Sequence, residues 1–166
     1  MRDPQRSQAH LTSKQLQIIL CLAIVAALVL ADRVSKNFFT ATLGMGESIP
    51  VVRNIFHFTL VYNTGIAFGL FKNQGFIFIV VPLIAAMLIG FNIYYYRNNH
   101  DIPLLYVVAF SLIFGGAVGN LIDRVLYGHV IDFIDFRIWP VFNLADSAIT
   151  IGTAIILIKC IPLFSK

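Results

Sequence analysis

Charged side chains are scarce in this sequence of 166 residues. Only 12% of the residues are Asp, Glu, Lys or Arg, while 58% are hydrophobic and the mean hydropathy is +0.83. Soluble domains carry charge on roughly a quarter of their residues, so this composition indicates a single integral membrane domain over residues 1–166. The net charge of +4 comes from scattered basic residues. It therefore favours anionic lipid headgroups as a partner and argues against nucleic acid.

Histidine and cysteine are also few. The four histidines are dispersed and form no His-Glu-x-x-His motif, so we expect no metal site. The sequence has no Gly-x-Ser-x-Gly motif and no phosphate-binding glycine loop, and we expect no cofactor. The two cysteines, Cys21 and Cys160, lie in apolar segments and are predicted to be buried small side chains rather than a disulfide. Carboxylates remain as the groups that can carry chemistry.

Four apolar stretches are predicted to cross the membrane as helices, at about 15–31, 75–96, 102–122 and 143–163. The first could instead be a cleaved signal peptide, but three further spans follow it and favour an uncleaved anchor. An even number of spans places both termini on one side. Basic residues divide evenly between the two sides, and the cluster before the first span favours termini in the cytoplasm.

The long loop after the first span carries a pattern typical of strands. From residue 55 to 62, large apolar residues (Phe56, Phe58, Leu60 and Tyr62) alternate with Ile55, His57, Thr59 and Val61, which predicts a small extracytoplasmic β element at about 48–71. It could be a structural cap or a lid over a site, and the sequence does not distinguish the two. Gly115, Gly116 and Gly119 include a Gly-x-x-x-Gly pair, which predicts close helix packing. The expected fold class is therefore all-α integral membrane with this added sheet.

Two aspartates stand out near the last span. Only 147–158 is free of charge in that span, whereas a bilayer crossing needs about 20 residues. Either Asp146 lies near hydrocarbon depth, or Lys159 extends its ammonium group to the interface, or both. Asn143 is a plausible helix N-cap, which favours an ionised Asp146. Asp132 has apolar neighbours on its strand face, which favours a neutral acid. Such a pair could act as acid and base around one water. The alternative is that Asp146 only caps its helix.

Other charged residues have more ordinary interpretations. Asp135 has a cation at Arg137 and is predicted to be a solvated structural charge. Asp123 and Arg124 close the third span as an ion pair that sets helix depth. The run 32–36 is predicted to be a polar belt at the outer end of the first span. Asparagines at 63, 120 and 143 are expected to orient backbone or substrate.

Five motifs in this order resemble those of the bacterial lipoprotein signal peptidases (signal peptidase II), a family of four-helix membrane aspartyl proteases. They are 32–36 (DRVSK), 63–69 (NTGIAFG), 119–124 (GNLIDR), 130–135 (VIDFID) and 142–146 (FNLAD). The resemblance implies that Asp132 and Asp146 are the catalytic pair. It also implies a supporting and substrate-binding set made of Asp32, Lys36, Asn63, Gly65, Asn120, Asp123, Arg124, Asn143 and Ala145. The segment 136–141 is shorter than expected for the family.

The same resemblance implies a substrate and a location. The family removes the signal peptide of prolipoproteins just before a cysteine that carries a diacylglyceryl group, and cyclic peptide antibiotics of the globomycin type block it. We therefore expect a monomeric, multi-pass protein of the bacterial cytoplasmic (inner) membrane, with its site near the outer leaflet. Two other classes remain as alternatives: a small transporter or proton pathway with intramembrane acids, and a non-catalytic assembly factor that would tolerate loss of both aspartates.

Overall fold

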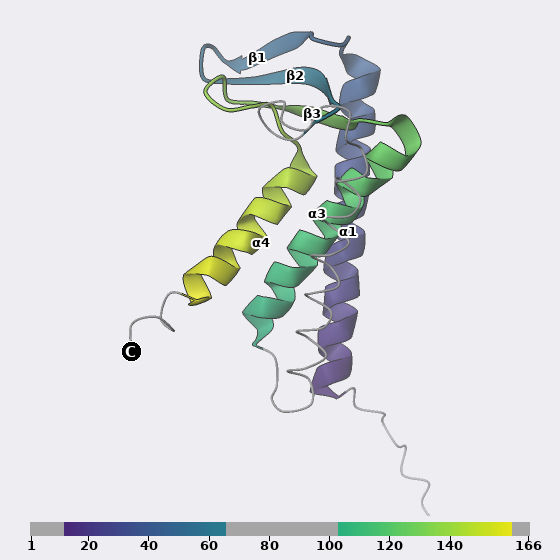
Figure 1. The fold of residues 1–166 in the computed structure, drawn as a ribbon, viewed down its shortest axis with the longest axis vertical. Helices are drawn as coiled ribbons and strands as arrows, with labels where there is room; N and C mark the ends of the chain where they lie inside the picture. Colours follow the sequence, from purple (N-terminus) through teal and green to yellow (C-terminus); the bar gives the residue numbers. More distant parts are fainter. Residues whose placement is uncertain (1–11, 66–102, 161–166) are drawn as a thin grey trace, which may run out of the picture.

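The computed structural model describes residues 12–65 and 103–160, which form three helices and one small sheet (Figure 1). Helices α1 (Ser13–Thr42) and α3 (Leu104–Tyr127) are long and apolar enough to cross a membrane, since each contains an 18-residue stretch of high mean hydropathy, 2.3 in α1 and 2.0 in α3. Helix α4 spans Leu144–Cys160. The predicted span at 75–96 and the last residues of the span at 143–163 lie outside the described residues. The four-helix count is therefore an expectation that these residues do not test.

Helix α1 is longer than the sequence predicts. It begins with a capping box in which the Thr12 hydroxyl accepts from the Gln15 backbone N–H and the Gln15 side chain accepts from the Thr12 N–H. The helix does not stop at residue 31, where the predicted span ends, but continues to Thr42. Asp32 and Lys36, which are predicted to lie in a polar belt, are buried and form an ion pair one helical turn apart. Charges neutralised inside the protein do not end a helix.

Helix α3 packs against α1 on one side and α4 on the other through glycines, which confirms the predicted role of this stretch. A Cβ at Gly115 would lie 2.9 Å from a methyl group of Leu28 in α1, whereas one at Gly116 would collide with the backbone oxygen of Ala145 in α4. Gly128, in the left-handed conformation with φ 75°, ends α3. Backbones come close here because these positions lack a side chain.

Cys21 is a free thiol that is partly exposed on α1, so its predicted burial is wrong. The physical reason is that only 6% of the apolar window of α1 is buried within the described part of the chain.

The sheet has three antiparallel strands in the order β1 (Ser48–Val52), β2 (Phe56–Asn63) and β3 (Val130–Asp135). The first two strands confirm the predicted β element as far as residue 63, and its last part, 66–71, lies outside the described residues. The third strand comes from a distant segment that the predicted element did not include. It pairs with β2 through His57↔Asp135 and Asn63↔Val130, with an irregularity of register between Phe58 and Val61.

The sheet lies across the end of the helices where α1 and α3 finish and α4 begins (Figure 1). A small apolar cluster joins it to α1: Leu60 of β2 and Ile131 of β3 are buried against Leu43, with Phe39 and Phe58 packed beside them. The rings of Phe39 and Phe133 also stack, with centroids 4.3 Å apart. This packing holds β3 directly above the first turn of α4, and both predicted acids lie on these two elements.

Candidate active site

Asp132 and Asp146 come together at the junction of the sheet and the helices. Asp132 is in the middle of β3 and is 1% exposed, while Asp146 is in the first turn of α4 and is partly exposed. The prediction that Asn143 caps α4 is confirmed, since its side-chain oxygen accepts from the Asp146 backbone N–H at 2.9 Å. The carboxylate of Asp146 is therefore fixed at a helix N-terminus, where a negative charge is stabilised.

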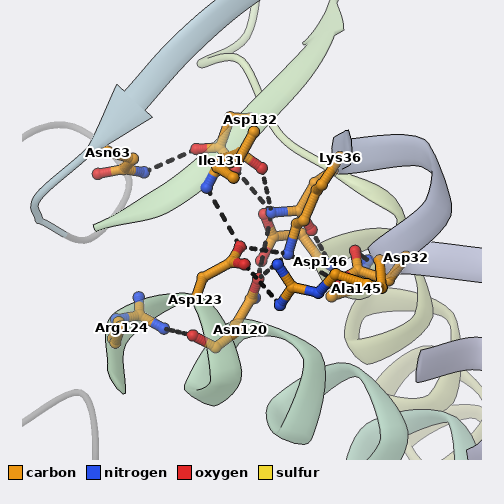
Figure 2. A network of polar contacts seen from close by, with 12 residues as sticks. Asp32, Lys36, Asn63, Asn120, Asp123, Arg124, Ile131, Asp132, Ala145 and Asp146 are labelled. Carbon is orange, nitrogen blue, oxygen red and sulfur yellow. Dashed lines mark hydrogen bonds and ion pairs between the residues drawn. The ribbon is translucent and has the colours of Figure 1, made fainter. Parts of the chain in front are cut away.

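Asparagine amides surround both carboxylates (Figure 2). Asp132 accepts from Asn63 Nδ2 at 2.9 Å through Oδ2 and from Asn143 Nδ2 at 2.7 Å through Oδ1. Asp146 Oδ1 accepts from Asn120 Nδ2 at 2.7 Å. Asn143 Nδ2 also donates to Asn120 Oδ1 at 3.2 Å, so two amides link the two acids. All three predicted asparagines are thus in contact with the pair: Asn63 from β2, Asn120 from α3 and Asn143 from the position just before α4.

A buried charge cluster lies directly beneath these amides. Lys36 has no exposed surface, and its ammonium is 2.7 Å from Asp32 Oδ2 and 2.7 Å from Asp123 Oδ2. Arg33 contacts the other oxygen of Asp123 at 2.8 Å. The predicted ion pair at Asp123 therefore has the wrong partner: its cations come from α1, whereas Arg124 donates to the Asn120 backbone oxygen at 3.2 Å. Helix geometry accounts for this, because adjacent residues on a helix point in different directions.

The cluster also holds the elements that carry the acids. Asp32 Oδ1 accepts from the Ala145 N–H at 3.1 Å, and Asp123 Oδ2 accepts from the Ile131 N–H at 3.3 Å. Each backbone donor directly precedes one of the two aspartates. The buried Gly65 donates its N–H to Asn63 Oδ1 at 3.0 Å. Every residue of the predicted supporting set is therefore in the site or bonded to it.

Arg33 belongs to this cluster but was assigned only to a polar belt by sequence reasoning. Its spacing of three residues from Lys36 places both cations on one helix face, and that was the available signal. Within 12–65 and 103–160, no three His, Cys, Asp or Glu side chains are grouped in a way that could hold a metal ion.

Burial and charge raise the pKa of Asp132 to about 7. Burial is the larger cause and the nearby carboxylate of Asp146 the second, while hydrogen bonds from Asn63 and Asn143 and the charge of Lys36 act in the opposite direction. The expectation that Asp132 favours the neutral form is confirmed in direction. An acid with this pKa exists in both protonation states near neutral pH, as acid–base chemistry requires.

Asp135, at the end of β3, has a different environment. It is 4% exposed, so its prediction as a solvated charge is wrong, although its predicted partner Arg137 lies 3.5 Å away. Burial would raise the pKa of Asp135, but hydrogen bonds from Thr59 (2.6 Å) and the Arg137 N–H (2.8 Å), with the Arg137 charge, outweigh it and lower the pKa. It stays ionised and joins the strands.

Known proteins show what the chain is similar to. The sequence profile of the family described as signal peptidase (SPase) II matches residues 24–162. The lipoprotein signal peptidase of Moorella thermoacetica is 46% identical over 134 residues, covering 80% of this chain and 87% of the relative. That of Clostridioides difficile is 40% identical over 150 residues, covering 89% and 99%.

Solved structures agree. A structure described as a bacterial membrane enzyme, determined at 2.3 Å resolution, superposes with a TM-score of 0.80 at 34% identity and covers 89% of this chain and 91% of its own. A second, at 1.9 Å resolution, has a TM-score of 0.75 at 34% identity and covers 90% and 95%.

Proposed function

This chain belongs to the signal peptidase II family, and we propose that it is a membrane aspartyl endopeptidase that uses Asp132 and Asp146 to cleave diacylglyceryl-modified prolipoproteins. Membership makes it a membrane peptidase of lipoprotein processing. The proposal adds the mechanism and the cleavage position, just before the lipidated cysteine. The observation that carries it is the pair of acids joined by Asn143 and Asn120, one of them with a pKa near 7.

The reaction follows from two acids in opposite protonation states. Ionised Asp146 takes a proton from a water molecule, and the resulting hydroxide attacks the scissile carbonyl carbon. Neutral Asp132 gives its proton to the carbonyl oxygen, which forms a tetrahedral diol. When the carbon–nitrogen bond breaks, the proton on Asp146 passes to the leaving amine, and a diol hydroxyl returns a proton to Asp132. The apparent pKa values then belong to the pair rather than to either residue.

The proposal includes the placement in the membrane. One membrane domain over 1–166 crosses the bacterial cytoplasmic membrane four times, with cytoplasmic termini and the sheet on the outer side. The substrate's acyl chains stay in the outer leaflet while the scissile bond reaches the acids, so lipid binding far from the bond contributes to positioning. Cyclic peptides of the globomycin type would occupy the same site of a monomeric enzyme. The supporting residues, including Arg124 and Asn63, orient the substrate and the acids.

Purified protein tests this proposal. We expect Asp132→Asn and Asp146→Asn each to abolish cleavage of a diacylated precursor while the protein stays folded, because neither amide can exchange the required proton. Asp135→Asn is the matched control on the same strand and should retain cleavage. The non-lipidated form of the precursor should remain uncut. If either active-site variant processed the lipidated precursor at the wild-type rate, the acids would not be catalytic and a non-catalytic assembly role would be supported.

The pH dependence gives a second test. Asp132 must hold a proton to act as the acid, and its pKa is about 7. We therefore expect kcat to fall as the pH rises above about 7 and to be restored on return to lower pH. A rate that stays constant up to pH 9 would contradict the role of Asp132 as the acid.

A further inference from the structure

The three amides around the acids share one orientation. Each has its oxygen held by a group that can only donate: Asn63 by the Gly65 N–H, Asn143 by the Asp146 N–H, and Asn120 by the Lys36 ammonium at 3.1 Å. Each amide then directs its NH2 group at a carboxylate: Asn63 and Asn143 at Asp132, and Asn120 at Asp146. Figure 2 shows the contact between Asn63 and Asp132. The pattern of donors and acceptors is therefore the same three times.

Lys36 differs from the other two anchors because it is a side chain. A main-chain N–H can be removed only by substitution with proline, which also constrains the backbone, whereas the ammonium group is removed by an ordinary side-chain substitution. An ammonium has three donors and no acceptor, so only the oxygen of Asn120 can face it. Rotating the amide by 180° would set NH2 against ammonium and oxygen against the carboxylate of Asp146, and both hydrogen bonds would be lost.

Stability alone is a weak reason for this arrangement. Lys36 and Asp123 have no exposed side-chain surface, and Asp32 has 1%. Removing charges from water is costly, and packed apolar residues often stabilise a core as well as a buried ion pair does. Apolar residues in place of the ion pair would lack a donor to the side-chain oxygen of Asn120.

We propose that Lys36 is a positioning residue of the active site: by holding the oxygen of Asn120 it directs the amide NH2 to Asp146 and keeps Asp146 the ionised member of the pair. This inference rests on the proposed function and adds to it the side chain that keeps the proton on Asp132 rather than on Asp146. Three charged groups act on Asp146 from the packed elements, namely Lys36 of α1, Arg124 of α3 and Asp132 of β3. Lys36 acts on Asp146 mainly through the Asn120 amide rather than through its charge alone.

The test uses a charge-balanced variant, because a single loss of Lys36 would leave two buried acids with one cation. Lys36→Met combined with Asp32→Asn removes one charge of each sign, and the new amide oxygen can still accept from the Ala145 N–H. Arg33→Gln is the control for the loss of a positive charge from the cluster, since Arg33 pairs with Asp123 whereas Lys36 also holds the oxygen of Asn120. The measurement is the pH dependence of kcat on a diacylated precursor.

The acid limb of the profile is the low-pH side, where kcat falls as Asp146 becomes protonated. We expect this limb to move to higher pH by about one to two units in the double variant, because losing a hydrogen bond to a charged group changes its pKa by about that much. Arg33→Gln should keep the wild-type limb. A merely structural role would lower the amount of folded protein and leave the position of the limb unchanged. An unmoved limb in the folded double variant would overturn the proposal.

A double-mutant cycle separates the amide from the charge. In an Asn120→Ala background, replacing Lys36 and Asp32 should cause no further shift, because the amide that transmits the effect is gone. A shift of the same size in both backgrounds would mean that Lys36 acts by its charge, and the proposal would fail.

Infrared titration of the carboxyl band without substrate provides a readout besides activity. The band lost in Asp146→Asn should titrate at higher pH in the double variant than in the wild type. If the wild type did not cleave the precursor but the band still shifted, the proposed function would fail while the role of Lys36 stood. If the wild type cleaved the precursor but the band did not shift, the proposed function would stand and the role of Lys36 would fail.

Discussion

Asp132 is a single residue at which the needs of folding and of chemistry oppose each other. Its pKa of about 7, against 3.8 in an unfolded chain, means that the folded state binds the proton more tightly. Between these two values the folded state holds more protons than the unfolded state, so stability falls as the pH rises and the loss is complete above about pH 7. The buried charge thus destabilises the protein under working conditions.

Asp132→Asn should therefore raise the melting temperature at pH 8 while it abolishes cleavage. The amide carries no proton that titrates here, so the difference from the wild type should shrink as the pH is lowered and vanish near pH 4. A shift of a few degrees corresponds to roughly 1–2 kcal/mol in a domain of this size. Thermal unfolding in detergent at several pH values measures it. If the variant were less stable than the wild type at pH 8, the hydrogen bonds that the Asp132 carboxylate accepts would stabilise the protein by more than its buried charge destabilises it.

How far the sequence predicts the site differs from residue to residue. Asp146 and its cap Asn143 are three residues apart, so local helix rules reach both. Lys36 bonds Asn120 across a separation of 84 residues, and no local rule connects them. Asp135 was misjudged for the same reason, because its partner Thr59 lies 76 residues away on the neighbouring strand.

At the scale of elements, adjacent glycines on α3 face different helices. Gly115 faces a side chain of α1, and Gly116 faces the backbone of α4 at Ala145. A side-chain methyl group can move aside, but a backbone carbonyl cannot move without its helix. The Gly-x-x-x-Gly spacing predicts that these glycines pack helices together, but it does not say which neighbouring helix each glycine contacts.

Gly116→Ala should lower stability by about 1–3 kcal/mol, the usual cost of an overpacked contact. It should also reduce kcat, because the displaced Ala145 precedes Asp146. Gly115→Ala is the matched control, since Leu28 can adjust and alanine gains about 1 kcal/mol of helix propensity. Melting curves and cleavage rates of the two variants provide the comparison. Equal stability of the two would mean that α4 tolerates the shift.

At the scale of the whole molecule, the sheet lies at one end of the helices and the start of α1 lies at the other (Figure 1). The polar site residues gather beside the strands of the sheet (Figure 2). Apolar runs predicted this separation, because charges cannot stay at mid-membrane. The sequence did not predict the pairing of β3 with β2, because the two strands are separated in the chain by residues 66–102 and local patterns do not connect them. The apolar runs thus predicted at which end of the helices the site lies, but not that a sheet containing β3 lies over it.

Thiol labelling in intact cells tests the orientation. Met45 is 73% exposed in the turn after α1, and Ser13 is exposed at the opposite end. In a background of Cys21→Ala and Cys160→Ala, Met45→Cys should react with a membrane-impermeant maleimide added outside the inner membrane. Ser13→Cys should react only after permeabilisation. The opposite pattern would place the sheet in the cytoplasm and contradict the proposed placement.

The uninterrupted course of α1 past Asp32 has one more consequence. From Ser13 to Asp32 the helix rises roughly 29 Å at about 1.5 Å per residue, close to the roughly 30 Å of hydrocarbon in a typical bilayer. Lipids with longer acyl chains would then extend over the charge cluster, and hydrophobic mismatch would tilt the helix that supports it. We expect cleavage in vesicles of matched headgroup to slow as acyl chains lengthen beyond this thickness, and a rate independent of chain length would refute it. A cell that remodels its fatty acids would thereby also change how fast it matures its lipoproteins.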